Sequence, residues 1–95
     1  MEKGLRKFIE AVRPRNTREL VQDHVRRVEV TRGEVLLHVD KRYAFNLINS
    51  SGHVENVIAS VKRAFGKEAR TVIQLDKNAA GREREKAVPH AIHYS

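Results

Sequence analysis

The chain has 95 residues, and its 19 Lys or Arg against 12 Asp or Glu give a formal net charge of +7. Apolar residues make up 40% of it, which suits one small domain with a modest core but not a large enclosed active site. The absence of cysteine excludes disulfides, thiolate metal sites and cysteine catalysis. Because no apolar stretch approaches the ~20 residues of a membrane span and no signal-peptide pattern opens the chain, we expect a cytoplasmic protein.

Two amphipathic helices are predicted in the first 25 residues. Four apolar residues recur at the i, i+3, i+4, i+7 spacing of one helix face: Leu5, Phe8, Ile9 and Val12. This first helix should end before Pro14, because proline disfavours helical geometry at the residue that precedes it. Asn16 and Glu19 have the spacing of a capping box, which predicts a second helix over residues 17 to 25.

The apolar pattern then changes to a period of two. Residues 28–31 and 34–39 alternate on either side of Arg32 and Gly33, which predicts a β-hairpin with a glycine-containing turn. Its second strand should turn Val35, Leu37 and Val39 inward, and His38 should then be exposed on the opposite face.

Two further helices follow the hairpin. Asp40 is placed to cap a helix over residues 41 to 49, whose inward face should be formed by Tyr43 or Ala44 with Leu47 and Ile48. The next helix should cover residues 53 to 65 and end at Gly66, where a left-handed C-cap is expected.

The last predicted element is a β-branched strand over residues 71 to 75, at whose open edge two copies could pair. Residues 77–95 are predicted to be a basic, flexible tail beyond a domain of residues 1–76. The order α-α-β-β-α-α-β predicts an α+β fold with a three-stranded sheet and helices packed on one face.

Motifs for catalysis or cofactor binding are missing from the sequence. It has neither a glycine-rich phosphate loop nor a serine nucleophile elbow. Glu83 and Glu85 lie in the predicted tail, where we expect solvated carboxylates. His90 and His93 have a spacing that two metal ligands can use, but zinc takes three or four ligands, so we interpret them as surface histidines. We therefore expect a protein that is not an enzyme and has no cofactor and no metal.

Basic residues are the strongest functional candidates, because Lys and Arg that neutralise phosphates provide the sequence-independent part of nucleic-acid affinity. They gather at the corner of the first two helices, at the hairpin, at the start of the third helix and at the end of the fourth. The candidates are Arg13, Arg15, Arg18, Arg27, Arg32, Lys41, Arg42, Lys62, Arg63 and Lys67. The alternative is an ordinary solvated surface with i,i+4 pairs, such as Asp23 with Arg27.

A family resemblance is carried by residues 32–75, RGEVLLHVDKRYAFNLINSSGHVENVIASVKRAFGKEARTVIQL. This run resembles the KH-like module shared by the N-terminal domain of the bacterial initiator DnaA and by DciA-type proteins. In such modules a hairpin strand ends in a polar stretch, an aromatic residue opens a helix, and a glycine precedes the last strand. The matching parts are residues 40–42, Tyr43 and Gly66, and the two preceding helices extend the resemblance over about residues 5–76.

The resemblance implies a role in DNA replication, because such modules dock onto the replicative helicase and contact DNA. In the DnaA module the aromatic residue that opens the third helix contacts the helicase, which would make Tyr43 the partner-binding residue. With no ATPase region the chain is more similar to a DciA-type factor, and with no G-x-x-G loop we do not expect single-strand clamping. The alternatives are an RNA-binding module, a pure protein-interaction domain, and a Tyr43 that packs on the domain's own core.

Overall fold

The computed structural model describes residues 3–76 and 91–94, which form four helices and a mixed four-stranded sheet. The elements are, in chain order, α1 (Lys3–Ala11), α2 (Arg15–His24), β1 (Val25–Thr31), β2 (Glu34–Val39), α3 (Arg42–Ile48), α4 (Val54–Phe65), β3 (Arg70–Leu75) and β4 (Ala91–Tyr94). The predicted α+β class and the order of the first seven elements are confirmed.

The strands lie in their sequence order, β1-β2-β3-β4. β1 pairs with β2 and β3 pairs with β4 in antiparallel fashion, whereas β2 and β3 are parallel. A parallel pair needs a long crossover, and α3 and α4 provide it. One row of side chains crosses the whole sheet through the register pairs of Val28 with Leu37, Leu37 with Ile73, and Ile73 with Ile92.

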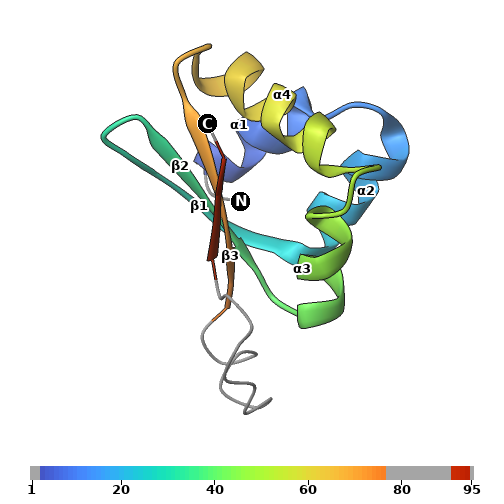
Figure 1. Cartoon of the computed structure of the whole chain (residues 1–95). Helices are drawn as coiled ribbons and strands as arrows, with labels where there is room; N and C mark the ends of the chain where they lie inside the picture. The colour runs from blue at the N-terminus through green and yellow to red at the C-terminus, as the bar shows by residue number, and fades with distance from the viewer. Residues whose placement is uncertain (1–2, 77–90, 95) are drawn as a thin grey trace.

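The helices cover one face of the sheet, and the side chains between the two layers form the core (Figure 1). Phe8 and Val21 from the first two helices pack with Phe45 and Val61 from the last two against Leu37 and its neighbours, and all of these side chains are buried. The sheet face that points away from the helices bears the alternate residues of each strand. Its side chains are largely polar or charged, as expected for a sheet with one solvated face.

The second helix begins earlier than predicted. α2 starts at Arg15, its N-cap is Pro14, and no side chain caps it. The capping-box prediction is wrong because the Asn16 side-chain oxygen Oδ1 accepts from the neighbouring main-chain amide of Thr17 rather than from a later one. Thr17 itself is fully buried.

The third helix is rotated relative to the prediction. Ala44, Phe45 and Ile48 are its buried residues, whereas Tyr43 and Leu47 lie exposed on its outer face. The helix begins at Arg42 after the N-cap residue Lys41, and no side chain caps it. The predicted capping role of Asp40 is therefore wrong.

The sheet has four strands rather than the predicted three. Residues 91–94, which were expected to belong to a flexible tail, form β4 and cover the edge of β3 that the sequence left open. The Tyr94 hydroxyl donates to the Asn49 side-chain oxygen at 2.6 Å, and burial raises the pKa of that hydroxyl. The predicted residues Glu83, Glu85 and His90 lie outside the described part of the chain.

The fourth helix has the predicted extent to within one residue and ends at Gly66. Gly66 has φ 112° and ψ 149°, so it turns the chain through a conformation that favours glycine but is not the predicted left-handed one. Among residues 3–76 and 91–94, no helix combines the length and apolar character needed to cross a membrane.

Candidate nucleic-acid interface

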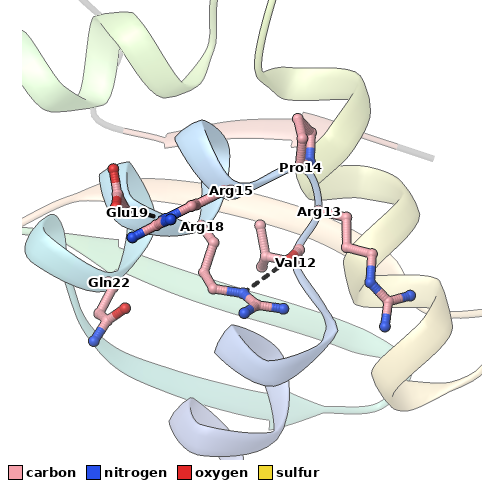
Figure 2. Close-up of a pocket in the computed structure, with 7 residues that line it drawn as sticks. All are labelled: Val12, Arg13, Pro14, Arg15, Arg18, Glu19 and Gln22. Atoms are coloured by element: carbon pink, nitrogen blue, oxygen red, sulfur yellow. Dashed lines mark hydrogen bonds and ion pairs between the residues drawn. The ribbon is translucent and has the colours of Figure 1, made fainter.

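The first basic group surrounds the connection between α1 and α2. We call it the α1–α2 corner and define it by Arg13, Arg15, Arg18 and Arg63. The first three line a shallow hollow together with Val12, Pro14, Glu19 and Gln22 (Figure 2). The fourth reaches it from α4, because an Arg63 guanidinium nitrogen donates to the carbonyl of Ala11.

Two of the corner arginines cap the end of α1. Arg18 Nε donates to the Val12 carbonyl oxygen at 3.1 Å, next to the Ala11 carbonyl that accepts from Arg63. The last carbonyls of a helix lack partners within it and carry the negative end of its dipole. Both guanidinium groups therefore stabilise α1, and each retains further N–H donors for another acceptor.

The other two corner arginines do not converge. Arg15 pairs with Glu19 at 3.2 Å in an exposed i,i+4 ion pair. Figure 2 shows Arg13 pointing away from Arg15 and Arg18. Within the described residues Arg13 contacts no carboxylate, so its positive charge is offset by no direct partner.

The second basic group lies at the far end of the β-hairpin. We call it the hairpin end and define it by Val30, Arg32, Gly33, Lys67 and Arg70. Arg32 and Gly33 form the two-residue turn, and the Arg70 amide donates to the Gly33 carbonyl at 2.8 Å. The hydrogen bond joins the hairpin to the α4–β3 connection, which contains Lys67. It thus brings together basic residues that are more than 30 positions apart in the sequence.

Arg27 belongs to an ion-pair cluster on the open sheet face. Its guanidinium contacts the Glu29 carboxylate at 3.2 Å, and His38 Nε2 donates to the same carboxylate oxygen at 2.7 Å. The hydrogen bond from His38, followed by the charge of Arg27, lowers the pKa of Glu29 below its ordinary value. The predicted pair of Asp23 with Arg27 is not formed, and the side chain of His38, expected to be exposed, is mostly buried beside Glu29.

Tyr43 lies at a junction of α2, β2 and α3. His24 Nδ1 contacts the Asp40 carboxylate at 2.9 Å, and its Nε2 lies 3.4 Å from the Tyr43 hydroxyl. The two rings also meet edge to face, with centroids 5.2 Å apart. Arg26 donates to the other Asp40 oxygen at 2.9 Å, so the Asp40 carboxylate that was predicted to cap α3 instead orients His24.

The surface beside Tyr43 is partly apolar. Tyr43 is 61% exposed and Leu47, one helical turn later, is 45% exposed. Leu47 was predicted to lie in the core, and this prediction is wrong. The alternative interpretation of Tyr43, as a core residue with only its hydroxyl in water, is wrong too. The two side chains form an exposed apolar pair on α3, which we call the α3 surface.

The remaining predicted basic residues are distributed around these groups. Lys41 is exposed at the start of α3, and Arg42 is half-buried beside it. Lys62 lies in the last turn of α4. One basic residue that the sequence prediction omitted is Lys7, whose amine lies 5.5 Å from the centre of the Phe65 ring. The helical spacing of α1 indicated that Lys7 was exposed, but not that it faces the end of α4.

A hydroxyl–imidazole pair also occurs, but it is buried. Thr17 Oγ1 lies 2.9 Å from His53 Nδ1 and accepts from the Asn56 amide at 3.0 Å. Because Thr17 is fully buried, no substrate can reach this hydroxyl, and the network serves to join α2 to the start of α4. Within the described residues, no three His, Asp or Glu side chains are grouped closely enough to hold a metal ion.

No family model, no curated protein and no solved structure matches this chain. The similarity to the DnaA and DciA modules therefore stays a prediction from the sequence.

Proposed function

We propose that this protein is a non-enzymatic DNA-binding adaptor. The proposal rests on one observation, which is that most of the ten candidate basic residues have no carboxylate partner among the described residues. Arg15 and Arg27 pair with carboxylates, and Arg42 also interacts with another group, so these three are set aside. The other seven have no carboxylate partner among the described residues. These seven are Arg13, Arg18, Arg32, Lys41, Lys62, Arg63 and Lys67.

Cations without carboxylate partners favour a polyanionic ligand. A protein that places Lys and Arg against phosphates releases the counterions condensed on the nucleic acid, which provides affinity without any base contact. Ion pairs within the protein would oppose this, because each pair must be broken or shared when a phosphate arrives. The net charge of +7 adds a long-range attraction for a negative backbone.

The proposal predicts salt-dependent DNA binding. In a fluorescence-anisotropy titration with a labelled 20-bp duplex, log K should fall linearly with log salt, with a slope of about −0.9 for each phosphate contacted. Arg15→Gln, which removes a cation already paired with Glu19, should change the slope less than Arg13→Gln, which removes an unpaired one. Failure to bind duplex DNA even at ~50 mM salt would contradict the proposal.

A second candidate function is docking of a protein partner on the α3 surface. The favouring observation is that Tyr43 is exposed yet held in place by His24, which lowers the entropy cost of using it as an anchor. An aromatic residue beside an apolar neighbour and flanked by the charged Lys41 has the composition of an interface hot spot. The resemblance to the DnaA and DciA modules implies that the partner is the replicative helicase.

Docking is tested by two substitutions at one position. Tyr43→Ala should reduce capture of purified replicative helicase at least tenfold, because hot-spot truncations cost about 2 kcal/mol or more. Tyr43→Phe should retain most of the binding, since it keeps the ring and its edge contact with His24. Unchanged melting temperatures would show that the fold is intact, and equal capture by all three proteins would exclude this docking mode.

A further inference from the structure

The hairpin end projects as an arm from the body of the molecule. Figure 1 shows the β1–β2 turn extending beyond the helices, on the side opposite the connection between α1 and α2. Residues 29–33 are all exposed, and Val30 is 54% exposed although its alternation with Val28 turns it toward the helix side. No helix therefore covers the last residues of the arm.

The backbone at the tip is strained by an arginine. Arg32 has φ 49° and Gly33 has φ 82°, which is the pattern of a type I′ hairpin turn. Turns of this type favour asparagine or glycine at both central positions, because other side chains clash with the backbone at positive φ. Arg32 occupies the first position at a cost in stability, and it makes no hydrogen bond or ion pair with the described residues to offset that cost.

The shape of the arm suits the major groove of duplex DNA. β3 runs beside β2 as far as Arg70, which pairs with Glu34, so the part that extends beyond the sheet is the turn of Arg32 and Gly33 together with the end of β1. The two strands that the turn connects lie ~4.8 Å apart. The major groove of B-form DNA is ~12 Å wide and ~8.5 Å deep, and it admits a two-stranded β-ribbon. The major groove of duplex RNA is too narrow for protein side chains to read, so this shape favours DNA.

The charges around the arm suit the phosphates that border a groove. The two acidic residues nearest the turn are already compensated, Glu29 by Arg27 and His38, and Glu34 by Arg70 at 3.8 Å. Lys67, in the connection beside the turn, has no carboxylate partner in the described chain. The arm thus presents a cation at its tip and a further cation in the connection beside the turn.

From these observations, and resting on the DNA binding proposed above, we propose that the hairpin end enters the major groove of duplex DNA. Arg32 at the tip contacts base edges there, where a guanidinium can donate two hydrogen bonds to one guanine. Lys67 lies toward the phosphates at the rim of the groove, while Arg70 keeps Glu34 compensated. The exposed methyl groups of Val30 are available to the methyl group of thymine.

The test is a substitution that improves the turn while it removes the guanidinium. Arg32→Asn places a favoured residue in the type I′ turn, so the melting temperature should rise by about 5 °C. Its affinity for a 20-bp duplex should nevertheless fall at least tenfold at ~100 mM salt. Lys41→Asn is the matched control, because it also removes one cation and also installs a good cap, at the start of α3 and at the opposite end of β2. Its affinity should fall about threefold or less.

Several outcomes overturn the inference. Equal losses for Arg32→Asn and Lys41→Asn would mean that only net charge matters, and unchanged binding of Arg32→Asn would remove the arm from the interface. Both results leave DNA binding itself intact, whereas a wild-type protein that binds no duplex refutes the proposed function. Equal affinity for duplex RNA of the same sequence would exclude major-groove insertion. Arg32→Lys, which keeps the charge but loses the paired donors, should bind more weakly to a guanine-containing site than wild type.

Discussion

At the α1–α2 corner, Arg18 and Arg63 each donate to a main-chain carbonyl at the end of α1, whereas Arg32 at the hairpin end donates to no described residue. The corner arginines satisfy acceptors that the fold would otherwise leave unpaired. Arg32 instead occupies a backbone conformation that suits asparagine or glycine. Arginine side chains therefore stabilise the fold in one region, whereas in the other an arginine occupies a strained backbone position.

The difference between these regions separates stability from recognition. A residue that lowers the stability of a fold without an internal contact is a candidate for an external one, and strained positions often occur at functional sites. The sequence alone weights all ten basic candidates equally. Their internal partners divide them into ion-paired cations, cations that also stabilise the end of α1, and cations with no hydrogen-bond or carboxylate partner among the described residues.

The largest expected effect comes from removing the cations that cap α1. Arg18→Ala combined with Arg63→Ala should lower the free energy of unfolding by about 2 kcal/mol, because each change removes one charge-assisted hydrogen bond to a carbonyl. Arg13→Ala is the control at the same corner, and it should stay within about 0.5 kcal/mol of wild type. Urea denaturation measures all three proteins. If Arg13→Ala destabilised the fold as much as the double variant, α1 capping would not be the cause.

A smaller effect of opposite sign is expected at the hairpin end. Arg32→Asn should raise the free energy of unfolding by about 1 kcal/mol, because asparagine accepts positive φ more readily than arginine does. The same urea titration gives the value. A loss of stability would show that Arg32 makes stabilising contacts in solution, and the contrast between the two regions would disappear.

The smallest effect is a pH dependence beside the hairpin. The pKa of Glu29 is lowered in the folded protein by the hydrogen bond from His38 and by the charge of Arg27. Its contribution to stability is therefore present above the unfolded-state pKa and is lost as the pH falls through the lower folded-state value. Between about pH 5 and pH 3, Glu29→Gln should lose less stability than wild type. Parallel pH profiles of the two proteins would contradict this linkage.

Periodicity predicted most of the fold, but the placement of single faces depended on packing. The apolar spacing of α1 and α4 and the alternation around Gly33 gave elements close to the observed ones. α3 has only seven residues, so its apolar residues were compatible with either of two neighbouring buried faces. The structure buries the face that contains Phe45 rather than the one that contains Leu47. β4 has four residues and depends on the edge of β3, so its sequence carries little signal of its own.

The candidate site was predictable in composition but not in geometry. The basic residues and the turn at Arg32 and Gly33 were predictable from the sequence, and the positive φ of both turn residues follows from a two-residue hairpin loop. It could not show that Arg63 reaches the Ala11 carbonyl, because that contact joins residues 52 positions apart. Long-range contacts of this kind decide which cations also stabilise the fold.

The contrast between Arg32 and the arginines that cap α1 is best measured by comparing the melting temperature and the affinity for a 20-bp duplex of Arg32→Asn and Arg63→Gln. Both variants remove one positive charge. We expect Arg32→Asn to melt higher and to bind DNA at least tenfold more weakly than wild type, whereas Arg63→Gln should melt lower and lose less affinity. Equal losses of affinity in the two variants, or a lower stability of Arg32→Asn than of Arg63→Gln, would refute this contrast.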